Sequence, residues 1–343
     1  MSKESRHVVH LAGIIPVANL NAGIDTAFPE VLLPLGDGYS AIQKSVYECA
    51  LAGCNTIWII ANDDLAPLVR KVVGEWVYDP VYYKRDKVKF YKELRKEIPI
   101  YYVPIHPKDR NRRDCYSWSV LHGVNSAWKV SVHLSKWITP TKYYISFPLT
   151  TYNLDTIREN RLSISKKDKN FYLSYNNKTV KDNLPIAFTL TGDDFIQCRR
   201  NLNKMTTREY LPPLPGQQYP QGKLPLTERW SARTFTLETV FAPLNSDKAT
   251  VVPVDWHYDI STWIGYREYM EDKGNSLRPP YSELIRSRKH APIIAYTPLK
   301  PGLSEKDLLR LREEELTKVE KEAKRLKSQI KRMKKNRKGL TIS

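Results

Sequence analysis

The sequence predicts an α/β protein in three layers, with a mainly parallel mixed sheet between two layers of helices. Short apolar runs alternate with segments of helical periodicity along the first half of the chain. The first of these units, residues 7–62, has the order strand, loop, strand, helix, strand. Because strands joined through helices usually lie parallel, this order predicts a sheet with helices on both faces. A hydrophobic content of 41% in 343 residues fits a chain that buries a large core.

The elements of the first unit follow from local signals. An apolar run at residues 14–17 predicts a strand that leads into a loop of small residues. A proline-anchored turn at 28–30 precedes a second apolar run at 31–35. The helix after it ends at Ala52-Gly53, where glycine is the usual stop signal, and residues 56–61 read as a buried strand. A first strand that ends in such a loop is where α/β folds hold phosphates, because free backbone N–H groups point at the anion.

Later elements are predicted in the same way. Residues 63–74 predict a helix that Gly74 ends, and residues 118–128 predict another. Residues 210–223 are rich in proline and glycine and predict a loop, with polyproline recognition as an alternative use. An aromatic and basic segment at about 76–97 reads as an insertion. Strands are predicted at residues 98–105, 142–147 (central in the sheet), 170–175, 186–191, 233–239 and 250–254.

The predicted domain organisation is an α/β domain over residues 1–300, with an irregular β-rich part at 150–250, and a basic C-terminal helix over 303–339. Seven apolar residues of this helix fall on a heptad seam, which predicts a short coiled coil. They are Leu309, Leu316, Val319, Ala323, Leu326, Ile330 and Met333. Self-association through residues 309–333, docking on its own domain and contact with nucleic acid by the basic end are the alternatives.

The net charge of +18 is the unusual bulk property. The last 41 residues hold 14 Lys and Arg against 7 Asp and Glu, and the rest of the chain is also basic. A basic protein attracts polyanions, so nucleotides, nucleic acid or an acidic partner are expected. No apolar run approaches the roughly 20 residues of a membrane span, so no membrane partner is expected. Four scattered cysteines and a polar N-terminus predict free thiols and a cytoplasmic location.

Several sequence blocks, in the family's order over roughly residues 8–270, resemble the nucleotidyltransferases that include sugar-1-phosphate nucleotidylyltransferases and cytidylyltransferases. Residues 17–23 (VANLNAG) stand where this family has its glycine-rich loop. Residues 29–36 (PEVLLPLG) and 52–59 (AGCNTIWI) are similar to its next two phrases. The later blocks are 119–124 (SVLHGV), 145–149 (ISFPL) and 256–263 (WHYDISTW). The resemblance implies a Rossmann-like three-layer α/β/α fold and a nucleotide or nucleotide-sugar ligand.

The positions that carry the family's chemistry are mostly replaced. The family's loop arginine aligns with Gly23, its lysine with Glu30 and its first metal-binding aspartate with Ser146, whereas its second is kept as Asp259. In this respect the chain resembles degenerate members of the family that occur in large tailed bacteriophages. If it is encoded by such a phage, its expected location is the host cytoplasm. Two functions stay open. One is transfer of a nucleotidyl group from an NTP to a phosphorylated small molecule such as a sugar phosphate, with release of pyrophosphate. The other is a degenerate fold that serves as a scaffold for nucleic acid or a partner.

The resemblance implies a catalytic and metal-binding role for Asp259, with Mg²⁺ as the cofactor. Asp255 lies four residues earlier, so both carboxylates are candidate ligands of one cation, and a structural turn capped by Asp259 is the alternative. His257 between them is interpreted as a surface histidine, with metal binding as the alternative. The residues implied to contact the nucleotide are Ala18, Asn19, Asn21, Gly23, Asp25, Glu30, Ser119 and Gly123.

Overall fold

The computed structural model describes residues 10–17, 24, 26–36, 38–83, 97–105, 115–134, 139–166, 169–205, 210–225, 235–244 and 249–274. The chain divides into two units, residues 1–287 and 288–343, and every described residue belongs to the first. The predicted C-terminal helix at 303–339 therefore lies outside the described residues. Among the helices that are described, none is both long and apolar enough to cross a membrane.

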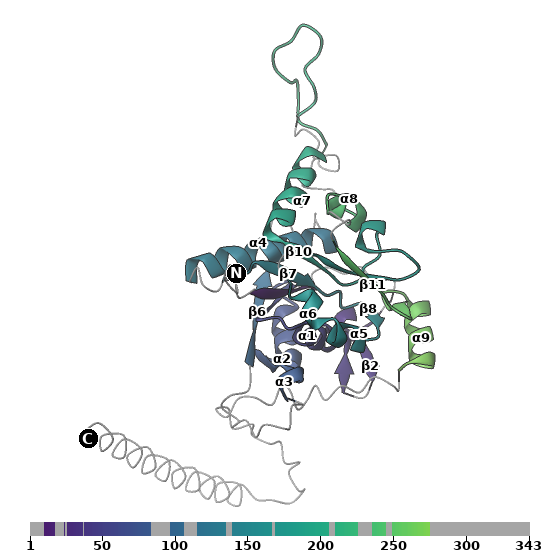
Figure 1. Cartoon of the computed structure of the whole chain (residues 1–343). Helices are drawn as coiled ribbons and strands as arrows, with labels where there is room; N and C mark the ends of the chain where they lie inside the picture. The colour runs from purple at the N-terminus through teal and green to yellow at the C-terminus, as the bar shows by residue number, and fades with distance from the viewer. Residues whose placement is uncertain are drawn as a thin grey trace, which may run out of the picture. The chain divides into compact units, whose positions relative to one another are not determined.

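Helices and strands alternate along the described chain (Figure 1). The strands are β1 Leu11–Pro16, β2 Pro34–Gly36, β3 Tyr39–Ser40, β4 Thr56–Ala61, β5 Trp76–Tyr78, β6 Glu97–Pro104, β7 Lys142–Ile145, β8 Thr150–Tyr152, β9 Phe171–Ser174, β10 Phe188–Thr191, β11 Thr250–Pro253 and β12 His257–Asp259. The helices are α1 Ala41–Ala52, α2 Ala66–Val73, α3 Pro80–Tyr83, α4 Tyr116–Leu134, α5 Asp155–Glu159, α6 Arg161–Ile164, α7 Gly192–Met205, α8 Leu237–Phe241 and α9 Trp263–Asp272, with the 3-10 turns η1 Glu30–Leu32 and η4 Val180–Asp182.

One mixed sheet organises the described part of the chain, in the order β11-β9-β10-β7-β1-β4-β6-β5. The four strands β7, β1, β4 and β6 are parallel neighbours at its centre. β10 runs antiparallel to both β7 and β9, β11 runs parallel to β9, and β5 runs antiparallel to β6 at the edge. Two short antiparallel pairs, β2 with β3 and β8 with β12, lie outside it. The predicted mainly parallel mixed sheet is confirmed.

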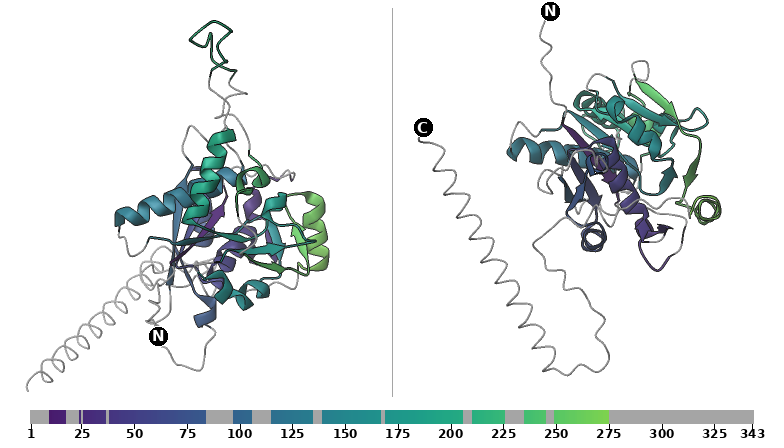
Figure 2. Two further views of the ribbon diagram at one scale, coloured as in Figure 1. Left: turned by 45° about the horizontal axis from the view of Figure 1, so that its top comes forward. Right: turned by 60° about the horizontal axis from the view of Figure 1, so that its bottom comes forward.

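Two hydrophobic cores, one on each face of the sheet, make the three layers. Successive side chains of β1 alternate between them, since Leu11 and Ile15 join the core around α1 while Ala12 and Ile14 join the core around α4. The first core holds α1, α2 and α5, and the second holds α4, α7 and α8. Figures 1 and 2 show these helix groups on opposite sides of the strands.

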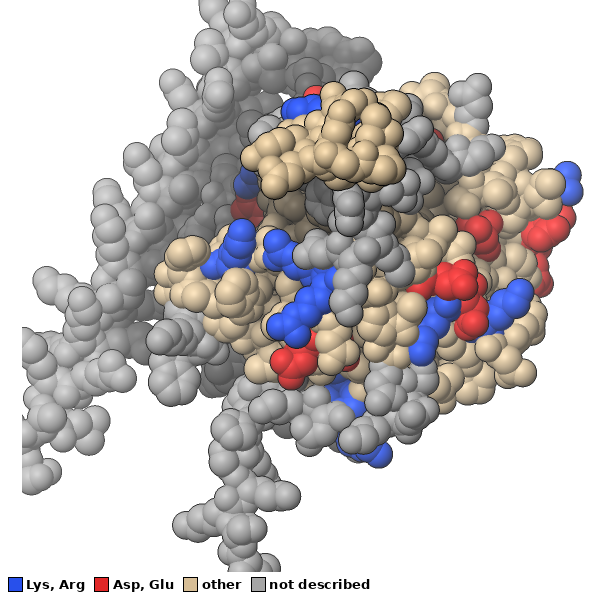
Figure 3. Space-filling view, turned by 90° about the horizontal axis from the view of Figure 1, so that it is seen from above, with Lys and Arg blue, Asp and Glu red and all other residues tan. Residues whose placement is uncertain are grey.

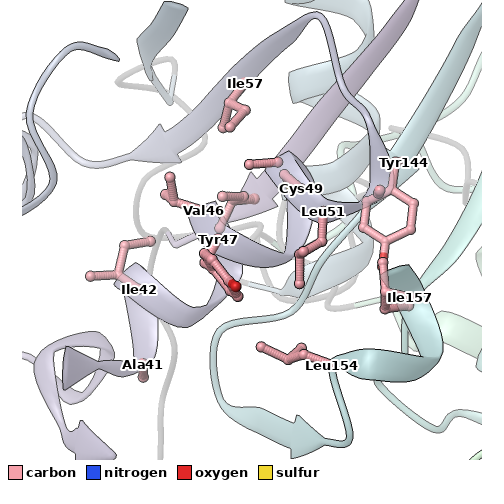
Figure 4. Close-up of a cluster of buried hydrophobic side chains, with 14 of the residues drawn as sticks. Ala41, Ile42, Val46, Tyr47, Cys49, Leu51, Ile57, Tyr144, Leu154 and Ile157 are labelled. Carbon is pink, nitrogen blue, oxygen red and sulfur yellow. The ribbon is translucent and has the colours of Figure 1, made fainter. Parts of the chain in front are cut away.

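Helix α1 is almost entirely enclosed, since eleven of its twelve residues are buried. At the start of α1, the side chain of Gln43 accepts a hydrogen bond from the backbone N–H of Ser40 at 2.9 Å. Gly53 ends it in a left-handed conformation with φ of 91°, as the sequence predicts. Figure 4 shows its apolar side chains between β4 and α5. Because so little of α1 meets solvent, its charged residues are buried too.

Helix α4 lies unusually close to the sheet because of Gly123. A Cβ atom at this position would stand 2.6 Å from Ile60 of β4 and 2.8 Å from Ile14 of β1. Real Cβ atoms do not approach neighbours so closely, so glycine at this point permits the contact between helix and strands. The predicted helix at 118–128 is confirmed and extends further, over Tyr116–Leu134.

The structure departs from the predicted elements in two places. The segment at about 76–97, interpreted as an insertion, begins with strand β5, which was not predicted and pairs with β6 in the sheet. The strand predicted at 233–239 is instead helix α8 from Leu237 to Phe241. Thr236 caps this helix by accepting from the backbone of Thr239 at 3.2 Å, and the apolar side chains of α8 point into one core. A short apolar run fits either structure, and the core contacts decide for the helix.

Candidate functional site

Strands β1 and β7 end side by side at one edge of the sheet. The backbone N–H of Ser146, which follows β7, donates to the carbonyl of Ile14 in β1 at 3.1 Å. β4 and β6 are parallel to these strands, so their carboxyl ends face the same edge. In open α/β sheets ligands bind outside the carboxyl ends of the strands. The candidate site is therefore at the end of the sheet where the parallel strands have their carboxyl ends, which is called the carboxyl edge, or simply the edge, below. The chain also leaves β1 toward residues 18–25 at this edge.

Five buried polar atoms in and around this edge have no hydrogen-bond partner within the residues described. They are Oη of Tyr116, Oγ of Ser119, Oγ of Ser146, Oγ1 of Thr151 and Nε2 of His257. Ser119 is in the first turns of α4, and Thr151 and His257 lie on the paired strands β8 and β12. Buried polar groups are ordinarily hydrogen-bonded, and one left unpaired costs about 1–3 kcal/mol. A polar ligand at this edge would give these atoms partners.

Tyr116 connects distant parts of the chain at the same place. Its ring packs edge-on against Phe147 with the ring centroids 5.0 Å apart. Burial raises the pKa of its hydroxyl, and the negative charges of Asp259 and Glu30 act in the same direction. Both carboxylates are therefore close enough to influence Tyr116 electrostatically. The fold thus brings Glu30, Tyr116 and Asp259 to one region.

Asp259 is exposed at the end of β12, where one of its oxygens is engaged. Oδ1 accepts a hydrogen bond from the backbone N–H of Ser261 at 2.9 Å, which is the contact of a turn cap. The same turn approaches α9 so closely that a Cβ at Gly265 would lie 2.0 Å from the carbonyl oxygen of Asp259. Asp255 is exposed in the bend before β12. Within the described ranges, no three His, Cys, Asp or Glu side chains are grouped so as to hold a metal ion.

These residues fit Mg²⁺ only if substrate phosphates and water supply most of its ligands. Mg²⁺ commonly takes one or two carboxylates and completes its shell with water and substrate phosphates. Oδ2 of Asp259 is the carboxylate oxygen here that meets this need, because Oδ1 already caps the turn. Ser146 offers a hydroxyl where the resemblance places a carboxylate. The roles of Asp259 and Asp255 as metal ligands stay a prediction.

A buried ion pair lies directly beneath the edge. Nζ of Lys44 is 2.9 Å from Oε2 of Glu48, and both α1 side chains are fully buried. Lys44 also donates to the carbonyl oxygen of Phe147 at 3.0 Å and lies 5.0 Å from the ring centre of Tyr152. Oε1 of Glu48 accepts from the hydroxyls of Tyr144 at 2.7 Å and Tyr152 at 2.6 Å. This network fixes the turn that follows Ser146, since Phe147 is its next residue.

His257 is half-buried, which corrects the interpretation of a surface histidine. Its ring stacks on Tyr175 with the centroids 5.5 Å apart. Burial lowers the pKa of His257 to about 4; the charge of Asp259 opposes this shift and that of Lys44 adds to it. The imidazole is therefore neutral at pH 7, and one of its nitrogens accepts hydrogen bonds.

The predicted nucleotide contacts divide into two groups. Glu30 and Ser119 lie around the edge, whereas Gly123 faces β1 and β4 and its lack of a side chain serves packing. Ala18, Asn19, Asn21, Gly23 and Asp25 lie outside the described residues. Sequence reasoning missed Tyr116, Lys44 and Glu48. The i, i+4 spacing of the ion pair was visible, but that spacing ordinarily marks an exposed helix face.

Comparisons with known proteins give structural similarity without sequence matches. No family model matches the sequence, and no curated protein matches it. A Bacillus anthracis structure assigned as a glucose-1-phosphate thymidylyltransferase aligns with 79% of this chain and 99% of its own, at 11% identity and a TM-score of 0.46. A UDP-glucose pyrophosphorylase complexed with UDP-glucose aligns with 76% of this chain and 97% of its own, at 12% identity and a TM-score of 0.46. Rv0371c from Mycobacterium tuberculosis aligns with 78% of this chain and 100% of its own, at 12% identity and a TM-score of 0.41. The fold assignment rests on the sheet order given above rather than on these similarities.

Proposed function

We propose that the chain binds a nucleotide at the carboxyl edge of the sheet and transfers its nucleotidyl group to a phosphorylated small molecule such as a sugar phosphate. The observation that carries this proposal is the set of five buried polar atoms at that edge that have no hydrogen-bond partner within the described residues. The order of the sequence blocks along the chain, which is that of the nucleotidyltransferase family, supports the same function.

In the proposed reaction, a phosphate oxygen of the acceptor attacks the α-phosphorus of the NTP. The bond from this phosphorus to the bridging oxygen breaks, and pyrophosphate leaves with the electron pair. Asp259 would hold Mg²⁺, which when bound neutralises phosphate charge. Ser119 and Ser146 would donate hydrogen bonds to the nucleotide, and Glu30 would keep the phosphates at a distance from its own side of the site. Positioning is the main task of a protein in phosphoryl chemistry.

Ligand-induced stabilisation tests the proposal. The full chain is heated with Mg²⁺ and each NTP in turn, and its melting temperature is measured. A nucleotide at about 100 times its Kd adds about 2.7 kcal/mol to the free energy of unfolding, which gives a clear rise for at least one NTP. Asp259→Asn should lose that rise and any pyrophosphate release with sugar 1-phosphates. Asp193→Asn, an equally exposed carboxylate at the start of α7, is the matched control and should keep both.

The second candidate is a non-catalytic scaffold. It is favoured by the replacement of three chemical positions, Gly23, Glu30 and Ser146, and by the turn cap that engages Asp259. Figure 3 shows Lys and Arg side chains interspersed with Asp and Glu over one described face. A scaffold for nucleic acid would be stabilised by DNA or RNA in a salt-dependent way and not by any NTP. That pair of results would overturn the proposal of nucleotidyl transfer.

A further inference from the structure

The segment after α7 exposes an unusual amount of apolar surface. Residues 210–225, called the proline arm here, hold five prolines and two glycines. Every residue from 210 to 221 is exposed, and Leu211, Leu214 and Tyr219 are 45%, 53% and 78% exposed. Figures 1 and 2 draw the arm as a narrow teal loop beyond the end of α7. Grouped apolar side chains on a surface ordinarily mark an interaction site.

The conformation of the arm is fixed by its own covalent structure. Pro212, Pro213 and Pro215 have φ near −65° because of their rings. Leu211, Pro212 and Leu214 each precede a proline, which restricts them to extended or polyproline II backbone. All five residues of the run Leu-Pro-Pro-Leu-Pro are thus restricted toward polyproline II before any partner binds. A pre-formed segment loses little conformational entropy on binding.

Both ends of this run are held by hydrogen bonds. Leu214 accepts from the backbone N–H of Gln217 at 2.9 Å, and Gly216 has φ of 88°. With Pro215 before that glycine, this is a type II turn. At the base, Leu211 donates to the carbonyl of Gly222 at 3.0 Å next to a β-bridge between residues 210 and 223. The arm is therefore a closed loop that presents one face of a polyproline segment.

A matching groove lies between α4 and α7 of the same chain. Its volume is about 150 Å³, which is below the 300–1,000 Å³ of small-molecule pockets and suits a few peptide side chains. Its lining is partly apolar and aromatic and partly polar, and the polar side chains at its rim carry hydrogen-bond donors. The apolar and aromatic lining residues are Trp118, Leu121, Phe195 and Leu202, and the polar ones are His122, Asn125 and Arg199.

The groove and the arm are complementary in hydrogen bonding. A proline-rich backbone lacks most N–H groups and offers carbonyl oxygens, so it needs donors from its partner. Nη1 of Arg199 donates to Oδ1 of Asn125 at 3.3 Å, which among the described residues leaves the Asn125 amide N–H groups and the other guanidinium N–H groups as donors. We propose that the proline arm of one copy of this chain docks in the α4–α7 groove of a second copy.

Sedimentation velocity of the full chain over a concentration series tests this proposal. Three arm substitutions, Pro212→Ala, Pro213→Ala and Leu214→Ala, are combined in one variant, and Arg199→Ala is made as a separate groove variant. Each should weaken self-association at least tenfold while far-UV circular dichroism stays unchanged. Gln217→Ala with Gln218→Ala is the matched control, because it alters the same loop outside the proline run. An equimolar mixture of the two variants should associate more strongly than either alone, since it pairs an intact arm with an intact groove.

Three results would overturn the proposal. One is a sedimentation coefficient that does not change with concentration. Another is self-association that persists in both variants, which would assign it to a different surface such as the predicted helix at 309–333. The third is binding of the arm to purified SH3 or WW domains, whose aromatic grooves accept polyproline segments, without any association between copies of the chain.

Discussion

The ion pair between Lys44 and Glu48 gives the sharpest energetic prediction. The pair lies at 2.9 Å with side-chain exposures of 1% and 0%. Exposed pairs at this i, i+4 spacing contribute about 0.2–0.5 kcal/mol. Removing one partner of a buried pair instead costs about 3–5 kcal/mol, because it leaves the other charge buried without compensation. We therefore expect Lys44→Met to lower the free energy of unfolding by about 3–5 kcal/mol.

The double substitution Lys44→Met with Glu48→Gln separates charge from packing. The amide introduced by Glu48→Gln would still present an oxygen to the hydroxyls of Tyr144 and Tyr152, and no buried charge would remain in the pair. The remaining loss is the hydrogen bond from Lys44 to the carbonyl of Phe147, about 1–3 kcal/mol for an unpaired buried group. The double variant should thus be more stable than Lys44→Met alone.

Urea unfolding at neutral pH, followed by circular dichroism, measures all four corners of this double-mutant cycle. The midpoints give the differences in free energy if the slopes agree. We expect the losses in free energy of unfolding caused by the two single substitutions to sum to at least about 2 kcal/mol more than the loss caused by the double substitution. If the effects add within about 0.5 kcal/mol, the two side chains are not coupled and the buried network described above is wrong.

Two further predictions concern His257 and Gly123. Burial lowers the pKa of His257 to about 4 in the folded state against about 6.5 unfolded, so only the unfolded state gains a proton as pH falls between these values. The free energy of unfolding should therefore fall by at most about 3 kcal/mol from pH 6.5 to 4. His257→Gln should flatten this part of the curve of melting temperature against pH. An unchanged curve would contradict the lowered pKa of His257. Gly123→Ala should destabilise the protein by about 1–3 kcal/mol in urea unfolding, because its Cβ would meet Ile60 at 2.6 Å. Gly192→Ala is the control, since a Cβ there meets no atom within 4 Å, and equal losses in both variants would refute the packing argument.

Elements whose signals are local were predictable from the sequence. Gly53 ends α1 because glycine tolerates the left-handed backbone that such an end requires, and this preference is visible in any sequence. β4 was predicted with its observed bounds, since a run of apolar and β-branched residues between turn signals has few alternatives. β5 was missed because three residues carry too little pattern, and its pairing with β6 is a long-range contact.

The sequence named some residues of the candidate site and left out others. Glu30, Ser119 and Asp259 were named because a motif surrounds each of them in the sequence. Tyr116 carries no motif, and only the approach of α4 to Phe147 brings it to the two carboxylates. His257 looked like a surface residue because polar neighbours surround it in sequence, whereas stacking on Tyr175 half-buries it.

By itself, then, the sequence determined the alternation of strands and helices and the mixed, mainly parallel sheet. These features depend on periodicity and on turn residues, which act over a few positions. The tertiary structure alone decided that Lys44 and Glu48 are buried, that Gly123 serves packing, and that five polar atoms at the edge have no partner among the described residues. Burial and hydrogen-bond partners depend on which distant segments meet, and a local pattern does not contain that information.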